Sequence, residues 1–132
     1  MRYRNIFFRI LRYWVPPFLW MMFIFFLSSQ RSVGVTHTYI YDFMIFKTIH
    51  MIEYAILYFL FFRAFHSIKL SLVYQLIYPV VVSIFFAASD EIHQLFVTSR
   101  EGTIRDVLID TVGIIIMYIL IRTNLKFLKR FI

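Results

Sequence analysis

The residues that could carry out chemistry lie in three short segments, each bordering or interrupting an apolar stretch. The first segment spaces Lys47, His50 and Glu53 three residues apart, so in a helix they lie on or beside one stripe. If this helix begins near Phe43, Glu53 lies about 15 Å from its start. A carboxylate at that depth in a membrane needs a partner or a proton. The alternative is an ion pair with Lys47 or His50 that only fixes the packing of the helix.

The second segment follows an apolar stretch and contains Asp90, Glu91, His93 and Gln94. Helical spacing puts Asp90 on one face with His93 and Gln94, whereas Glu91 lies about 100° around the helix. The segment could be a plain polar helix end at the membrane interface. Acidic residues are unfavourable at a helix C-terminus, however, because the macrodipole favours cations there. The segment is therefore also a candidate for function.

The third segment runs from Arg100 through Asp106 and Asp110 to Gly113. Asp106 suits a helix N-terminus, where the dipole favours anions, whereas Asp110 lies one turn deeper on the same face. Gly113 continues that face and would allow another helix to approach closely. Three helices would thus bring carboxylates toward a common site, with Arg100 on a nearby loop.

One interpretation of this site is a membrane enzyme that acts on a lipid or on a lipid-linked head group. An imidazole would serve as general base or nucleophile, and a carboxylate would orient the ring. Arg100 and Lys47 would hold a phosphate or another anion. The catalytic candidates are His50, Glu53, Asp90, Glu91 and His93, and the binding candidates are Lys47, Gln94, Arg100, Asp106 and Asp110.

The same carboxylates could hold a divalent cation as a cofactor. Oxygen ligands alone suit Mg²⁺ or Ca²⁺, and an added histidine suits Zn²⁺. The only short metal-like pattern, H-x-x-E formed by His50 and Glu53, is weak, so the metal stays undetermined. The candidate carboxylate ligands are Asp90, Glu91, Asp106 and Asp110.

Two other hypotheses fit the same residues. In the first, the protein binds a lipid tail without chemistry, and the charges form an ion-paired network around the cavity. In the second, buried acids and histidines serve proton-coupled transport, although four short spans rarely form a translocation path alone. The oligomeric state is not predicted.

The composition indicates that a membrane must position these residues. Of the 132 residues, 61% are hydrophobic and 21% aromatic, and only 16% are charged, against about 25% in soluble domains. This composition excludes a soluble globular protein. The net charge of +7 is typical of cytoplasmic ends and lipid contacts in membrane proteins, so no nucleic-acid partner is expected. The absence of cysteine excludes disulfides and thiolate chemistry.

Four apolar stretches predict an all-α bundle of four transmembrane helices, at about residues 14–30, 43–63, 70–90 and 106–122 of one domain. Basic residues gather in both tails and in the second connection, so the positive-inside rule predicts that both termini are cytoplasmic. The seven acidic residues, Glu101 among them, and three of the four histidines, including His37, fall on the opposite side. The candidate site is therefore predicted to face outward.

The sequence resembles the VanZ-like family of small bacterial membrane proteins. The similar blocks are Trp20–Gln30 (WMMFIFFLSSQ), Lys47–Tyr54 (KTIHMIEY), Asp90–Phe96 (DEIHQLF) and Arg100–Gly113 (REGTIRDVLIDTVG). One departure is Thr98-Ser99, where the family usually has Pro-Gly before the arginine.

The resemblance implies a multi-pass protein of the bacterial cytoplasmic membrane. Members of the family are linked to reduced susceptibility to teicoplanin, a lipid-tailed glycopeptide that acts outside that membrane. The implied partners are a membrane lipid, a lipid-linked envelope precursor or teicoplanin itself. This location agrees with the outward-facing site that the residues predict.

Overall fold

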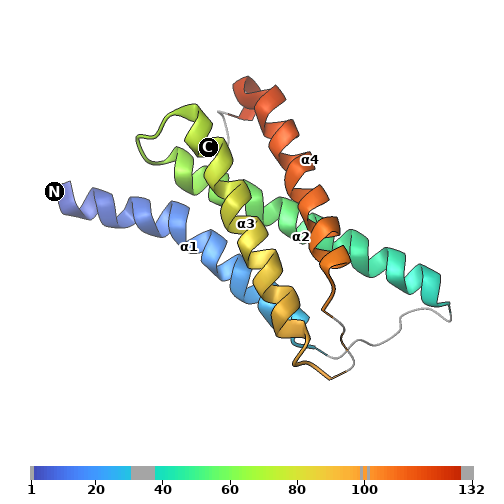
Figure 1. Ribbon diagram of the computed structural model, residues 1–132. Helices are drawn as coiled ribbons and strands as arrows, with labels where there is room; N and C mark the ends of the chain where they lie inside the picture. The colour runs from blue at the N-terminus through green and yellow to red at the C-terminus, as the bar shows by residue number, and fades with distance from the viewer. Residues whose placement is uncertain (1, 31–37, 99, 101, 129–132) are drawn as a thin grey trace.

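Four α-helices make up the fold in the computed structural model, which describes residues 2–30, 38–98, 100 and 102–128 (Figure 1). The helices are α1 (Arg2–Ser28), α2 (Tyr39–His66), α3 (Leu72–Gln94) and α4 (Ile104–Leu128). No strand occurs in this described part, so the all-α prediction is confirmed. His37, Ser99 and Glu101 lie outside the described residues.

Three of the helices contain segments long and apolar enough to cross a membrane, namely Phe7–Ser28, Ile40–His66 and Leu72–Gln94. α4 has a similar length, but it carries Arg105, Asp106 and Asp110 within its first two turns. These charges shorten its uninterrupted apolar part. A membrane crossing by α4 stays a prediction.

α1 is longer than the predicted span. It begins at Arg2 instead of near residue 14, because no glycine or proline interrupts the chain before Pro16. Pro16 and Pro17 therefore lie inside the helix, not at its start. Each proline lacks an N–H group and removes one helical hydrogen bond. The helix continues through both of them to Ser28, and Pro17 is fully buried.

α2 lies at the centre of the bundle and packs against each of the other helices. α1 contacts α3 only slightly, and in the described residues it does not contact α4 (Figure 1). Half of the apolar core consists of large side chains of α2, and each of the other helices contributes one or two residues. Its α2 members are Tyr54, Leu57, Tyr58, Phe61 and Phe62, joined by Ile24, Leu76, Ala87, Ile114 and Ile121.

The outer surface of the bundle is also apolar. Large side chains such as Phe26 of α1, Phe85 of α3 and Leu108 of α4 are more than half exposed. Water would not favour such a continuous apolar surface, whereas lipid acyl chains would cover it. The polar residues instead gather inside the bundle, at one end of the four helices.

α2 and α4 run in the same direction, and a glycine lets them approach closely. A Cβ atom at Gly113 of α4 would lie 2.0 Å from the carbonyl oxygen of Met51 in α2. The prediction that Gly113 allows close helix packing is thus confirmed. This contact fixes the height of the Lys47–Glu53 segment against the first turns of α4.

Candidate functional site

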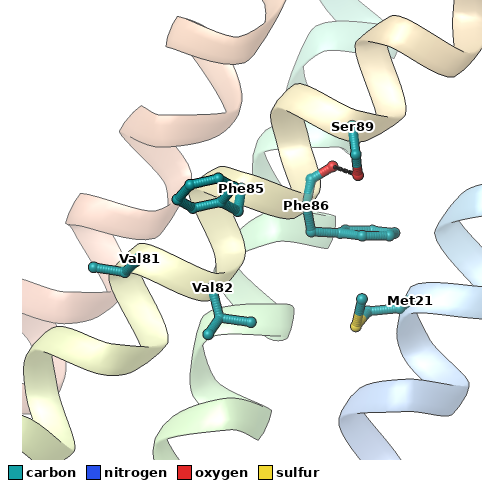
Figure 2. A pocket seen from close by; sticks show the side chains of 6 residues that line it. All are labelled: Met21, Val81, Val82, Phe85, Phe86 and Ser89. Atoms are coloured by element: carbon teal, nitrogen blue, oxygen red, sulfur yellow. Dashed lines mark hydrogen bonds between the residues drawn. The ribbon is translucent and has the colours of Figure 1, made fainter.

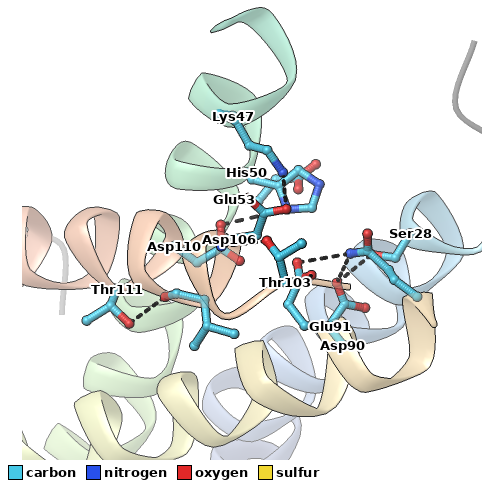
Figure 3. Close-up of polar contacts among 12 residues, drawn as sticks. Ser28, Lys47, His50, Glu53, Asp90, Glu91, Thr103, Asp106, Asp110 and Thr111 are labelled. Atoms are coloured by element: carbon cyan, nitrogen blue, oxygen red, sulfur yellow. Dashed lines mark hydrogen bonds and ion pairs between the residues drawn. The ribbon is translucent and has the colours of Figure 1, made fainter. Parts of the chain in front are cut away.

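Eight buried polar side chains form one group, here called the polar cluster, where α1 and α3 end and α4 begins. All eight residues are at most 9% exposed. Figure 3 shows most of them converging from four helices. The members are Ser28 of α1, His50 and Glu53 of α2, Asp90, Glu91 and Gln94 of α3, and Asp106 and Asp110 of α4.

Asp90 links the ends of α1 and α3. The Ser28 hydroxyl donates a hydrogen bond of 2.6 Å to Asp90 Oδ2, and Gln94 Nε2 donates to the same oxygen at 3.2 Å. The other carboxylate oxygen, Oδ1, is buried and has no hydrogen-bond partner among the described residues. The side chain is 1% exposed. A fully buried carboxylate with one free oxygen is costly unless a further ligand satisfies it.

Glu91 links α3 to the loop that leads into α4. The backbone N–H of Thr103 donates to Glu91 Oε2 at 3.0 Å, and Gln94 Nε2 donates to Oε1 at 3.3 Å (Figure 3). Gly102 makes this approach possible, because a Cβ atom there would lie 2.0 Å from the Glu91 carbonyl oxygen. The loop therefore holds the Glu91 side chain in a defined position.

Lys47 and Asp106 form the shortest ion pair of the site. Lys47 Nζ lies 2.6 Å from Asp106 Oδ2, and Arg105 Nε lies 3.4 Å from Oδ1 of the same carboxylate. The Asp106 side chain is nearly buried, whereas the Arg105 side chain is largely exposed. Lys47 thus neutralises a buried carboxylate across the interface between α2 and α4.

One helical turn deeper, His50 of α2 faces Asp110 of α4. His50 Nδ1 and Asp110 Oδ1 are 3.7 Å apart, which is too long for a hydrogen bond. His50 Nδ1 and Asp110 Oδ2 are both buried without a hydrogen-bond partner among the described residues. Both residues therefore have a buried polar atom that is still able to bind a further group.

Glu53 enters the cluster from the deepest position on α2. Its side chain is buried, and no other described residue reaches its carboxylate with a hydrogen bond or an ion pair. Its backbone carbonyl accepts a hydrogen bond of 2.9 Å from Trp20 Nε1, which joins α1 to α2. The alternative interpretation of Glu53, an ion pair with Lys47 or His50, is not observed among the described residues, because those two side chains turn to α4 instead.

His93 and Arg100 point toward α1 and away from the other candidates. The His93 ring stacks on Phe25 at a centroid distance of 4.1 Å, and its Nε2 lies 3.0 Å from the Ser29 hydroxyl. Arg100 donates hydrogen bonds to the backbone carbonyls of Gln30 and Leu27, at 3.1 and 3.4 Å. Both residues hold the end of α1 against the end of α3.

Residues 13–128 match the VanZ/LLP1 family. The chain belongs to the VanZ/LLP1 family. The comparisons found no match among curated proteins and none among solved structures.

The VanZ/LLP1 match contains every residue of the polar cluster and excludes only the first turns of α1 and the last few residues. It therefore supports a membrane protein built around this site, but it assigns no chemistry to any residue. The function must be argued from the arrangement of the side chains.

The structure brings eight of the ten candidate residues into one connected region and adds others that the motifs did not single out. Ser28, Ser29 and Thr103 supply hydroxyl or backbone groups to Asp90, His93 and Glu91. The pair Ser28-Ser29 directly follows an apolar stretch and lies within the Trp20–Gln30 block that resembles the VanZ-like family, and these two features were its signals in the sequence. A short polar end of a membrane helix can thus mark a partner for buried acids.

One group in the site has the composition of a metal centre. Single ligand atoms of His50, Glu91 and Asp110 all lie within 4.8 Å of one another. These residues come from three different helices, which places them at the centre of the α2, α3 and α4 packing.

Proposed function

We propose that this VanZ/LLP1 protein binds a lipid-tailed molecule of the bacterial envelope at the seam between α1 and α3. The tail lies in an apolar groove, and a hydroxyl-rich head group engages Asp90 and His93. Through this binding, the protein lowers susceptibility to teicoplanin. The observation that carries the proposal is that the groove is lined by Ser89, the residue before Asp90, whose carboxylate already accepts a hydrogen bond from a hydroxyl group.

The groove lies where α1 and α3 barely touch, and Figure 2 shows its wall of apolar side chains. Its volume is about 340 Å³. It is open toward the side of the bundle, where lipid acyl chains would lie. An apolar tail can therefore enter from the membrane without crossing polar surface. The lining residues are Met21 of α1 and Val81, Val82, Phe85, Phe86 and Ser89 of α3.

Beyond the groove, hydroxyl groups at the end of α1 contact polar side chains of α3. Asp90 accepts a hydrogen bond from Ser28, and His93 contacts the hydroxyl of Ser29. A sugar hydroxyl has the same hydrogen-bonding groups as these serines and can replace them. Bonds to an ionised carboxylate are stronger than neutral ones, which favours Asp90 as the main contact. Hydroxyl-rich head groups occur both on lipid-linked wall precursors and on teicoplanin.

The charge distribution supports an outward position of this site. Arg9, Arg12, Arg63 and Arg122 lie toward the end of the helices opposite the polar cluster. By the positive-inside rule, that end is cytoplasmic, and the polar cluster faces the outer leaflet. Teicoplanin and lipid-linked precursors are both present on the outer side.

Direct binding to the purified full chain in lipid nanodiscs tests the proposal. Teicoplanin and a polyprenyl-diphosphate-linked sugar precursor are titrated separately, so the two sources of the same head-group chemistry are distinguished. Vancomycin, which has no lipid tail, is the ligand control. We expect saturable binding of at least one tailed ligand and none of vancomycin. Equal binding of vancomycin, or no binding of either tailed ligand, would contradict the proposal.

Variants locate the binding. Val82→Trp fills the groove, whereas Val112→Trp makes the same change on the exposed face of α4. Asp90→Asn removes the negative charge from the head-group contact. We expect Val82→Trp and Asp90→Asn each to weaken binding about tenfold or more, since a charged hydrogen bond contributes roughly 1.5–3 kcal/mol. Val112→Trp should bind as the wild type does.

A second candidate is chemistry on the bound head group, which the arrangement of His50 and Asp110 favours. An imidazole beside a buried carboxylate is a general base when the substrate reaches it. Mass spectrometry of lipids from cells that express the wild type or His50→Gln separates the candidates. A modified lipid that depends on His50 indicates an enzyme, and unchanged lipids with intact ligand binding indicate a binding protein.

A further inference from the structure

The polar cluster contains more negative charge than its basic residues can neutralise. Only Asp106 contacts a lysine or arginine side chain among the described residues. Of the other four buried carboxylates, two accept hydrogen bonds and one lies beside His50, and none of the four forms an ion pair with a lysine or arginine among the described residues. Burying several unpaired carboxylates together is strongly unfavourable. Those four carboxylates belong to Glu53, Asp90, Glu91 and Asp110.

Three side chains of the cluster face one another with ligand atoms at close range. One nitrogen of His50 and one oxygen each of Glu91 and Asp110 lie within 4.8 Å of one another. Two atoms bound to one metal ion at about 2.1 Å can be at most about 4.2 Å apart, so small side-chain shifts would bring all three to an ion. α2, α3 and α4 each supply one ligand.

Unsatisfied atoms point to a ligand at this position. His50 Nδ1 and Asp110 Oδ2 are both buried and have no hydrogen-bond partner among the described residues. The Asp110 side chain is only 1% exposed. Buried polar groups are nearly always satisfied in folded proteins, so two such atoms side by side call for a bound ion or water.

The surroundings of Glu91 resemble the outer shell of a metal site. Gln94 Nε2 and the Thr103 backbone N–H each donate to one of its carboxylate oxygens, and each oxygen retains a second lone pair. Hydrogen bonds of this kind orient carboxylate ligands in metal centres. Gly102 keeps the Thr103 segment close enough to donate.

We propose that His50, Glu91 and Asp110 bind one divalent transition-metal ion, with Zn²⁺ as the best-fitting ion. Two ionised carboxylates neutralise the double positive charge of the ion. Mixed nitrogen and oxygen ligands suit zinc better than Mg²⁺ or Ca²⁺. Three protein ligands leave a fourth position for water or a head-group oxygen. The inference does not depend on the proposed function, because an ion can serve packing alone.

Calorimetric titration of Zn²⁺ into the purified full chain tests the site. The protein carries no affinity tag, is stripped with a chelator and is kept in detergent without added lipid-linked ligand. We expect one Zn²⁺ per chain and a rise in the melting temperature, whereas Mg²⁺ and Ca²⁺ should bind at least about 100-fold more weakly. Absence of stoichiometric Zn²⁺ binding would overturn the proposal, and tighter binding of Mg²⁺ or Ca²⁺ would overturn the assigned metal.

Matched variants show whether these residues are the ligands. Asp110→Asn and Glu91→Gln should each weaken Zn²⁺ binding by roughly 100-fold or more, beyond the 10–100-fold cost of losing an outer-shell partner. Asp106→Asn and Glu53→Gln change the same groups in the same cluster but outside the three ligands, and they should retain tight binding. Circular dichroism checks that each variant is folded.

The outcomes separate the ligands from the cluster as a whole. If a folded ligand variant binds Zn²⁺ as tightly as the wild type, the assignment is wrong. Equal losses in all four folded variants would also overturn it, because they would indicate a general effect of charge. Since no lipid-linked ligand is present, this result is independent of the binding experiment on the α1–α3 groove.

Discussion

Residues in and beside the polar cluster fall into two groups with different consequences. Lys47 and Asp106 satisfy each other, and this pair needs no ligand to explain it. Asp90 and Asp110 retain buried oxygens without a partner among the described residues. The first pair is therefore expected to stabilise the fold, and the second group is expected to bind ligands.

Lys47→Met tests the structural role of the ion pair. The substitution leaves Asp106 nearly buried without its closest cation, and loss of one partner of a buried pair costs about 3–5 kcal/mol. We expect a loss of about 3 kcal/mol in the free energy of unfolding, because Arg105 remains 3.4 Å away. Reversible unfolding in mixed detergent measures this change.

The double variant Lys47→Met with Asp106→Leu provides the control. Replacing both charges with apolar groups of similar size should recover most of the lost stability. If the single variant is as stable as the wild type, or if the double variant is no better than the single one, the pair does not stabilise the interface between α2 and α4.

Residue spacing predicted part of the site but not its pairings. The three-residue and four-residue steps placed Lys47 with His50 and Asp106 with Asp110 on common faces. The structure pairs them across two helices instead of within one. Spacing gives the face of a helix, but only the packing of neighbouring helices decides which partner that face meets. For this reason the alternative that paired Glu53 with Lys47 or His50 is not observed.

At the scale of the elements, one close contact aligns the helices that hold the site. Gly113 of α4 lies against the backbone of Met51 in α2. Sequence alone predicted a close approach at Gly113, because glycine is the smallest residue at membrane helix contacts. It could not predict that α2 would be the partner, since all the helices have apolar faces.

Gly113→Ala tests this alignment, because helix propensity and helix packing change the free energy of unfolding in opposite directions. Alanine stabilises an isolated helix by about 1 kcal/mol relative to glycine. Here the added Cβ would collide with the Met51 carbonyl oxygen, so we expect a net loss of about 1–3 kcal/mol in the free energy of unfolding. Detergent unfolding measures it, with Val112→Ala on the exposed face as control. A more stable Gly113→Ala variant would contradict the observed packing.

The prolines of α1 show that the helix boundaries predicted from the sequence were less reliable. The predicted first span began at about residue 14, which put Pro16 and Pro17 near its start, where a missing N–H group costs least. The structure instead continues the helix from Arg2 through both prolines. Proline is a weak boundary signal in a membrane helix. In lipid, the backbone N–H and C=O groups must form hydrogen bonds within the segment, and this requirement favours a continuous helix.

The whole molecule has polar groups inside and apolar groups outside, and both features follow from the composition. A chain that is 61% hydrophobic cannot cover its surface with polar side chains, so its exterior suits lipid. The few charged residues in the helices must then meet inside the bundle. The resulting site lies at one end of the bundle, next to an apolar groove that opens to the side.

Under the proposed function, this arrangement would allow one small protein to act on a lipid-tailed antibiotic and not on a tailless one. In the proposed function, the groove between α1 and α3 would select for a tail, and Asp90 and His93 would select for hydroxyl groups. Neither feature alone would distinguish teicoplanin from other envelope molecules. Their proximity makes the seam between α1 and α3 the central functional region of the proposed account.

Antibiotic susceptibility of cells provides the most direct test of that account. The wild type, Val82→Trp, Asp90→Asn and the control Val112→Trp are expressed at equal membrane levels in a teicoplanin-sensitive Gram-positive host. We expect the wild type and Val112→Trp to lower teicoplanin susceptibility without changing vancomycin susceptibility, and the other two variants to lose this protection. Full protection by Val82→Trp and Asp90→Asn, or no protection by the wild type, would contradict the account.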